Sequence, residues 1–131
     1  MIRERIAALI LKDKKILLVK DIHASHYYPP GGSLDEDESH EQALKRELTE
    51  KLSISLEQMN FYFSFELINK ILKMPQIDHC YLISFSGSPT PSSEVCDLKW
   101  VTKEEIVNKK IETPDAFFEK LVPRLVKDGL L

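Results

Sequence analysis

The sequence has 131 residues, of which 43% are hydrophobic and 30% are charged, and its formal net charge is −3 at pH 7. The length predicts a single domain over residues 1–131, and the composition predicts a soluble globular protein. The negative charge argues against general nucleic-acid binding, which calls for a basic surface. No apolar run is long enough to span a membrane and no signal peptide is recognisable, so we expect no membrane partner.

The two cysteines, Cys80 and Cys96, form neither a C-x-x-C motif nor a disulfide framework. We expect them to be reduced thiols, which indicates a cytoplasmic protein. The sequence leaves the oligomeric state open, and a homodimer is compatible with it.

Two apolar runs, residues 6–11 and 16–19, lie on either side of the polar segment 12–15. This pattern predicts a β-hairpin with mostly buried strands. The hairpin would therefore form the first part of the core.

The segment 21–28 is rich in side chains that can bind a ligand. His23 and His26 have H-x-x-H spacing, but a loop without further ligands favours a substrate entrance over a metal site. The loop runs directly into Pro-Pro-Gly-Gly, in which prolines fix an extended backbone and glycines allow close approach to an ion or phosphate. Tyr28 and Gly32 are therefore candidate substrate-binding residues.

A helix is predicted over residues 42–52, after the acidic loop 35–38. Ser39 and Gln42 form a plausible capping box at its start. One stripe of this helix carries three leucines that can face a core. Glu47 and Glu50 are neighbours on another surface. The helix could thus bury one side and present two carboxylates from the other.

Carboxylates beside a glycine-rich turn suggest a hard cation such as Mg²⁺, which prefers oxygen ligands. Charged residues on a helix more commonly form a solvated surface, and that alternative applies here. Glu47 and Lys51 have the spacing of a helical ion pair, which contributes about 0.2–0.5 kcal/mol.

Later strands are predicted over residues 61–67 and 79–85, separated by a loop over 70–77. The alternating phenylalanines of the first strand indicate a face that packs in the core. A third strand is expected over residues 94–101, after a Pro/Ser-rich loop at 87–93.

Two helices are expected near the C-terminus. Thr102 and Glu105 form a second capping box, which predicts a short helix to about residue 108. Thr113 and the proline after it mark the start of a terminal helix. Pro123 should kink or shorten that helix.

The segment 32–54 resembles the Nudix box, G-x5-E-x7-R-E-U-x-E-E-x-G-U, in which U is aliphatic. The matching positions are Gly32, Glu38, Arg46, Glu47, Leu48, Glu50 and Ile54. Two positions depart from the motif. Lys51 stands where the family has the second glutamate of its pair, and Ser53 stands where the family has glycine.

This resemblance implies an α/β protein, a Nudix-type α/β/α sandwich around a mixed β-sheet. It implies Mg²⁺ or Mn²⁺ as the cofactor. Its metal ligands would be the Gly31 carbonyl, Glu47, Glu50 and a carboxylate near the last strand, for which Glu94 is the first candidate and Asp97 the second.

The resemblance also assigns catalytic roles to Glu47, Arg46 and Glu38. Glu47 would be a metal ligand or the base, Glu38 a ligand through water or an orienting group, and Arg46 a holder of carboxylates. The implied reaction is hydrolysis of a nucleoside diphosphate linked to a group X. A nucleoside triphosphate, including an oxidised one, would suit so small a protein.

Lys51 leads to a second hypothesis, because it places an ammonium among the carboxylates. The chain would then be a non-catalytic Nudix domain that binds a nucleotide or a protein, with Lys51 on a phosphate. A third hypothesis, an RNA pyrophosphohydrolase, would require a basic channel, and the lysines here are scattered.

Overall fold

The computed structural model describes residues 2–131. In chain order its elements are β1 (Arg3–Leu9), β2 (Leu11–Lys12), β3 (Lys15–Asp21), β4 (Gly31–Ser33), α1 (His40–Leu52), β5 (Ser55–Asn69), β6 (Met74–Ser86), β7 (Val95–Thr102), α2 (Lys103–Val107), the π-helical turn η1 (Phe117–Leu121) and α3 (Val122–Lys127). None of the helices in this described part is long and apolar enough to cross a membrane.

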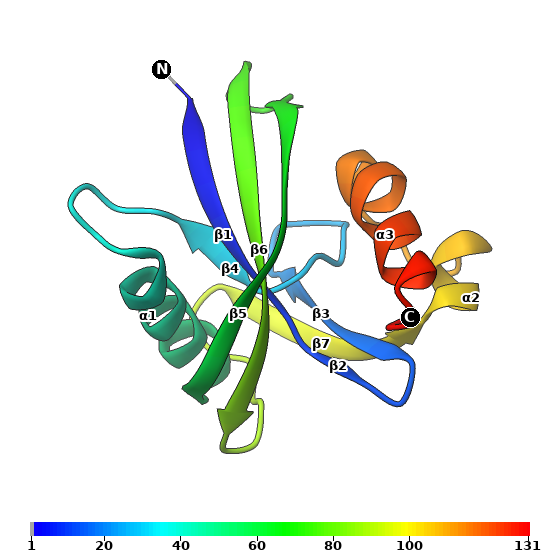
Figure 1. Cartoon of the computed structure of the whole chain (residues 1–131), viewed down its shortest axis with the longest axis horizontal. Coiled ribbons are helices and arrows are strands. Elements are labelled where there is room, and N and C mark those ends of the chain that lie inside the picture. Colours follow the sequence, from blue (N-terminus) through cyan, green and yellow to red (C-terminus); the bar gives the residue numbers. More distant parts are fainter. Residues whose placement is uncertain (1) are drawn as a thin grey trace.

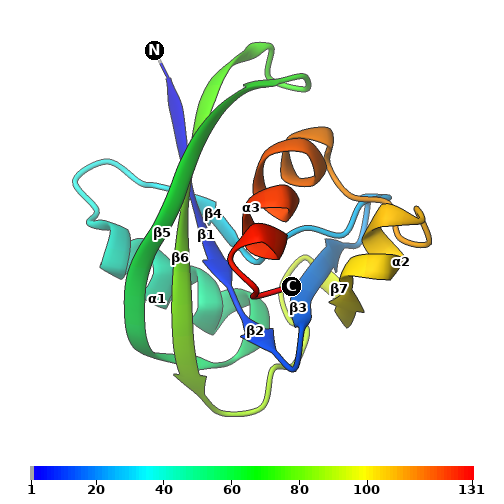
Figure 2. The ribbon, with the colours of Figure 1, turned by 45° about the vertical axis from the view of Figure 1, so that its right-hand side comes forward.

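The strands form two sheets (Figure 1). The first has the order β4-β1-β6-β5 and is mixed, because β1 and β6 are parallel and the other pairs are antiparallel. The second has the order β2-β3-β7 and is antiparallel. Helix α1 lies on one side of the strands, and α2 and α3 lie on the other, which Figure 2 shows from a second direction. The fold is therefore the predicted α/β type, with strands between two helical layers.

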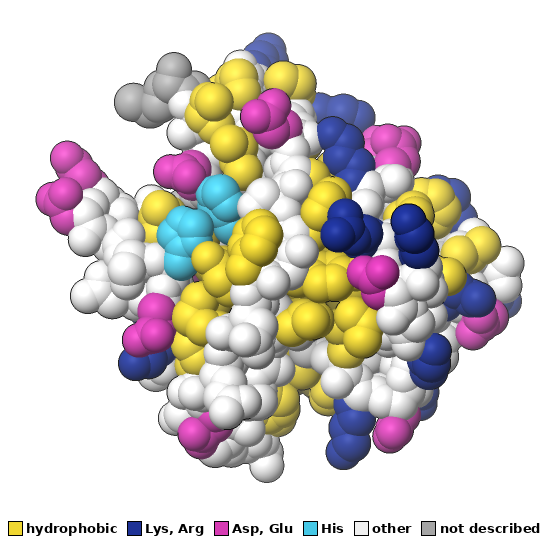
Figure 3. Space-filling model, viewed as in Figure 1, with side chains coloured by type: hydrophobic (Ala, Val, Ile, Leu, Met, Phe, Trp, Pro, Cys, Tyr) yellow, Lys and Arg dark blue, Asp and Glu magenta, His cyan; other side chains and the backbone are white. Residues whose placement is uncertain are grey.

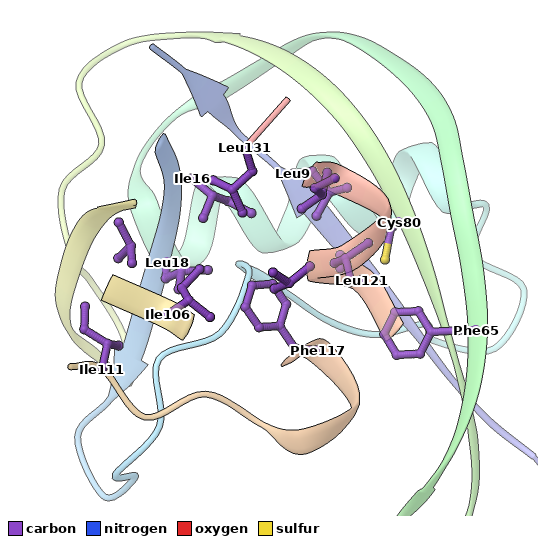
Figure 4. Packing of buried hydrophobic residues seen from close by; sticks show 14 residues of the cluster. Leu9, Ile16, Leu18, Phe65, Cys80, Ile106, Ile111, Phe117, Leu121 and Leu131 are labelled. Carbon is purple, nitrogen blue, oxygen red and sulfur yellow. The ribbon is translucent and has the colours of Figure 1, made fainter. Parts of the chain in front are cut away.

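Two hydrophobic clusters fill the spaces between these layers, and β1 contributes to both. Ile6 and Ala8 join the cluster under α1, whereas Ala7 and Leu9 join the cluster under η1 and α3. Figure 4 shows the second cluster, which includes Leu9 of β1 and Leu121 of η1. Successive strand side chains point to opposite faces, so a strand between two helical layers is apolar at nearly every position. This burial on both faces explains why the apolar runs at residues 6–11 and 16–19 are uninterrupted.

The predicted N-terminal hairpin is correct at its turn but wrong in its pairing. Leu11 and Lys12 pair with Ile16 and Lys15 as expected. The remainder of the first run, β1, pairs instead with β4 and β6. The chain therefore passes from one sheet to the other at Ile10.

The hairpin of β5 and β6 is longer than predicted. Strand β6 begins at Met74, inside the segment predicted to be a loop. A register shift between Phe61 and Phe63 interrupts the expected alternation. Phe61 is 60% exposed, whereas Phe65 is buried. The prediction that the whole phenylalanine stripe packs in the core is wrong at Phe61.

The predicted caps of α1 and α2 are confirmed. Ser39 and Gln42 form the capping box of α1, and Thr102 and Glu105 form that of α2. Ser53, the C-cap of α1, has a left-handed backbone with φ 56° and ψ 37°. It occupies the position at which the Nudix box has glycine, which adopts this conformation without strain.

The C-terminal helix is irregular, in agreement with the expectation that Pro123 kinks or shortens it. A π-helical turn occupies Phe117–Leu121 and is followed directly by α3. Proline has no N–H and its ring crowds the carbonyl four residues earlier, so a wider turn before it relieves both problems.

Candidate functional site

Arg46 of α1 holds the acidic loop against the helix. Its Nε and Nη2 atoms donate to Glu38 Oε2 and Oε1 at 2.8 and 2.9 Å, which makes a bidentate salt bridge. Nη2 also donates to the Ser33 carbonyl of β4 at 3.1 Å. The Arg46 guanidinium lowers the pKa of Glu38 to about 2 through these hydrogen bonds. Glu38 is thus a fixed carboxylate in the folded protein.

The same guanidinium orients Glu47. Arg46 Nη1 donates to Glu47 Oε1 at 2.8 Å. The other oxygen, Oε2, is buried and is the one buried side-chain polar atom in residues 2–131 that makes no hydrogen bond. Its charge is balanced by the Lys51 ammonium, whose Nζ atom lies 3.3 Å away, so Oε2 lies at a position that attracts a cation.

Gly32 of β4 makes room for this carboxylate. A Cβ atom at Gly32 would lie 2.3 Å from Glu47 Oε1. The sequence suggested that glycine lets the backbone approach a ligand here. The structure adds a second role that spacing could not indicate, which is to leave space for Glu47.

Lys51 lies where the candidate ligands converge. Its Nζ donates to the Gly31 carbonyl at 2.6 Å and lies 3.3 Å from Glu47 Oε2 and 3.5 Å from Glu94 Oε1. The side chain is only 11% exposed. Three of the four predicted metal ligands therefore surround the ammonium of this protein's own lysine.

The loop between β6 and β7 carries Glu94 to this point. Its backbone N–H groups at Thr90 and Ser92 donate to the carbonyls of Leu52 and Lys51, at the C-terminal end of α1. These carbonyls lack partners within the helix, so the loop satisfies them. The pKa of Glu94 is lowered by the Ser93 hydroxyl, its own backbone N–H and Lys51.

Asp97, the second candidate for this ligand, is bonded elsewhere. It accepts a 2.5 Å hydrogen bond from the Tyr27 hydroxyl, which raises the pKa of Tyr27 to about 12. Of the two carboxylates, Glu94 is the one that the structure brings to α1.

Glu50, the remaining predicted ligand, lies at the rim of the cluster. Its carboxylate is 55% exposed and 3.9 Å from Arg46 Nη1. Asp35 is also exposed and lies 3.5 Å from Arg46. The cluster of Asp35, Glu38, Glu47, Glu50 and Glu94 around Arg46 and Lys51 has five carboxylates against two cations, a net charge of −3. It will be called the acidic cluster.

Tyr28, a predicted substrate-binding residue, is fixed by its neighbours. Its backbone forms a two-way bridge with Val19, and its hydroxyl donates to Asp21 at 2.5 Å. The Arg5 guanidinium lies over its ring. Burial and the Asp21 hydrogen bond raise the pKa of Tyr28. Its contact with substrate stays a prediction.

A divalent ion suits the acidic cluster in its chemistry. All the candidate ligands are carboxylate or carbonyl oxygens, which Mg²⁺ and Mn²⁺ prefer. The unbonded Glu47 Oε2 is consistent with such an ion. The ion would compete with Lys51, because the ammonium already lies between Gly31, Glu47 and Glu94.

Comparisons with known proteins show the family to which the chain belongs. The family model of the NUDIX domain matches residues 1–123. A MutT NUDIX hydrolase from Burkholderia pseudomallei is 30% identical over 78% of this chain and 84% of that chain, with a TM-score of 0.71. The ORF135 protein of E. coli is 26% identical over 96% of this chain and 89% of that chain, with a TM-score of 0.78.

A third similar structure is the NUDIX domain of Shewanella oneidensis NrtR complexed with ADP ribose. It is 21% identical over 98% of this chain and 89% of that chain, with a TM-score of 0.75. No curated protein sequence matched the chain.

Proposed function

Because the chain belongs to the Nudix family, we propose that its acidic cluster hydrolyses the pyrophosphate bond of a nucleoside diphosphate linked to another group X. The observation that carries this proposal is the state of Glu47. Arg46 fixes one of its oxygens, while the other is buried without a hydrogen bond and has the Lys51 ammonium 3.3 Å away as its charge partner. A carboxylate fixed in this way is ready to bind a cation or to take a proton.

The net charge of the cluster supports the same proposal. A polyphosphate is repelled by a site of charge −3, so substrate binding requires an added cation. A bound Mg²⁺ or Mn²⁺ would polarise phosphoryl oxygens and lower the pKa of a water molecule. Glu47, Glu50, Glu94 and the Gly31 carbonyl would hold it.

The side chains of the cluster then have distinct tasks. Glu47 accepts the proton of the attacking water or binds the cation. Arg46 keeps Glu47 and Glu38 in place through charge-assisted hydrogen bonds. Tyr28 and Gly32 would contact the substrate beside the cluster.

Nucleoside triphosphates, including oxidised ones, are the first substrates to test. ADP ribose, the ligand in the NrtR structure, is a second kind of nucleoside diphosphate compound. We place the protein in the cytoplasm, where such nucleotides occur and where its thiols would stay reduced.

A second candidate function is binding without hydrolysis. It is favoured by the 2.6 Å hydrogen bond from Lys51 Nζ to the Gly31 carbonyl, because the ammonium then takes the place of a metal ion. A nucleotide or protein partner would bind to a site whose cation is built into the chain.

One experiment separates the two functions. Release of phosphate or pyrophosphate is measured for common and oxidised nucleoside triphosphates, ADP ribose, dinucleoside polyphosphates and nucleotide sugars, with Mg²⁺ and with Mn²⁺. Turnover that is lost on chelation supports the hydrolase. Binding of the same compounds without any turnover at high protein concentration supports the binding domain and contradicts the hydrolase.

A further inference from the structure

Two histidines and a glutamate meet at the start of α1, outside the acidic cluster. His40 is the first residue of α1, His79 lies on β6 and Glu4 lies on β1. One ligand atom from each residue lies within 4.8 Å of the other two. The two imidazole rings are 4.7 Å apart, and neighbouring histidines are visible beside α1 in Figure 3.

The Nδ1 atom of each imidazole already has a hydrogen-bond partner outside the group. His40 Nδ1 is 2.6 Å from the Tyr81 hydroxyl, and His79 Nδ1 is 2.9 Å from the Ser64 hydroxyl. Such outer hydrogen bonds fix the ring orientation and the tautomer of metal-binding histidines. They leave Nε2 of each ring as the atom available to an ion, and His79 Nε2 already lies 2.9 Å from Glu4 Oε1.

We propose that Glu4, His40 and His79 bind a transition-metal dication, with Zn²⁺ as the preferred ion. Two imidazoles and one carboxylate are a frequent zinc ligand set, and water completes the tetrahedron. Zinc–ligand bonds of about 2.0–2.2 Å place tetrahedral ligands roughly 3.4 Å apart. The half-exposed Glu4 and the partly exposed His40 can rotate to close the remaining distance.

The chemistry of this site differs from that of the acidic cluster. Imidazole nitrogen selects zinc, copper or nickel, whereas an all-oxygen cluster selects magnesium or manganese. His40 and Glu47 are seven positions apart on α1, which is about 10 Å along the helix axis. The two sites can therefore be filled independently.

The function of the bound ion would be to join three elements. Glu4 belongs to β1, His79 to β6, and His40 to the first turn of α1. An ion that binds the folded state alone stabilises it by an amount that grows with the logarithm of the ion concentration above Kd. Zinc should thus raise the melting temperature, with or without nucleotide hydrolysis.

The test is a Zn²⁺ titration of the full chain by calorimetry, with excess Mg²⁺ present to occupy the acidic cluster. All proteins carry Cys96→Ser, because the exposed Cys96 thiol could bind zinc by itself. We expect one Zn²⁺ per chain, and at least a tenfold weaker affinity in each of His40→Gln, His79→Gln and Glu4→Gln. Co²⁺ in place of Zn²⁺ should give the visible absorption of a tetrahedral site.

His23→Gln and His26→Gln are the matched controls, since these two histidines lie on the loop between β3 and β4. They should leave the affinity unchanged. Tyr81→Phe removes only the hydroxyl behind His40 and should weaken binding about tenfold, which keeps the test usable if a histidine variant fails to fold. Absence of stoichiometric zinc binding, or equal affinity in the parent protein and in Tyr81→Phe, would overturn the proposal.

Discussion

At the scale of single residues, the two consecutive glycines of β4 are required for different physical reasons. A Cβ at Gly31 would lie 1.9 Å from the backbone oxygen of Ile6, and a Cβ at Gly32 would meet the carboxylate of Glu47. A backbone atom cannot move aside cheaply, whereas the end of a glutamate side chain can. The first glycine therefore serves the fold and the second serves the site.

Alanine at these positions should separate the two roles. Gly31→Ala is expected to destabilise the protein by several kcal/mol, because it forces β4 away from β1. Gly32→Ala should change the free energy of unfolding by no more than about 1 kcal/mol. It should displace Glu47 and lower the rate of hydrolysis at least tenfold. Urea unfolding and initial rates measure both. An inactive Gly31→Ala with normal stability, or a fully active Gly32→Ala, would contradict these assignments.

Glu47 should be the most sensitive position of the cluster. Glu47→Gln keeps the shape of the side chain but removes the negative charge and the ability to take a proton. We expect a loss of two or more orders of magnitude in kcat. Glu41→Gln, an exposed change on the same helix, is the control. Retention of most activity in Glu47→Gln would show that the role assigned to Glu47 is wrong.

The sequence indicated the residues of the cluster but not all of their contacts. Helical spacing correctly placed Lys51 beside Glu47, since these side chains lie on one face of α1. Contacts with Gly31 and Glu94 join segments 20 and 43 residues away, and no local pattern encodes such distances. The histidine pair was missed for the same reason, because His40 and His79 come from different elements.

At the scale of elements, α1 is stabilised by hydrogen bonds at both of its ends. Its capping box begins it, and the loop before β7 binds the carbonyls at its end. The sequence predicted the caps, because capping is a local interaction. It did not predict that the loop over 87–93 docks on the helix, and it assigned β1 to the wrong partner strand, since both features depend on tertiary packing.

Ser53→Gly tests the strain at the end of α1. A non-glycine residue in the left-handed region costs about 1 kcal/mol or more. We therefore expect the variant to be more stable by roughly 0.5–1 kcal/mol in urea unfolding, with its activity unchanged. Ser55→Gly, at the start of β5, should be destabilising instead. A less stable Ser53→Gly protein would show that Ser53 gains a compensating interaction.

At the scale of the whole molecule, the acidic cluster should make stability depend on pH. The pKa of Glu38 is lowered to about 2 from an ordinary 4.5. A carboxyl group with a lowered folded-state pKa stabilises the fold above its ordinary pKa, and this contribution is lost as the pH falls towards 2. Glu38→Gln should thus be less stable than the parent at pH 7, with the difference shrinking between pH 4.5 and 2.

Unfolding by urea at a series of pH values provides the measurement. Glu36→Gln, in the same exposed loop, is the matched control. A stability difference between the parent and Glu38→Gln that stays constant from pH 7 to pH 2 would rule out the Arg46–Glu38 pair as its source.

The most direct test of the account concerns the position of the Lys51 ammonium at the centre of the candidate metal ligands. The repulsion between two unit positive charges about 5 Å apart, such as an ammonium and each charge of a nearby cation, is roughly 3 kcal/mol at an effective dielectric of 20. Water and salt reduce this energy. Replacing Lys51 by glutamate removes the competing cation and restores the carboxylate of the family motif. The loss of a buried charge partner should destabilise the metal-free variant by about 3 kcal/mol.

The measurement is a calorimetric titration of Mg²⁺ and Mn²⁺ into the parent protein, Lys51→Glu and Lys45→Glu, which makes the same charge change at an exposed position of α1. We predict at least tenfold tighter metal binding in Lys51→Glu, little change in Lys45→Glu, and faster hydrolysis by Lys51→Glu at limiting metal. Unchanged or weaker metal affinity in Lys51→Glu would contradict the account and would favour a binding domain in which Lys51 itself is the working cation.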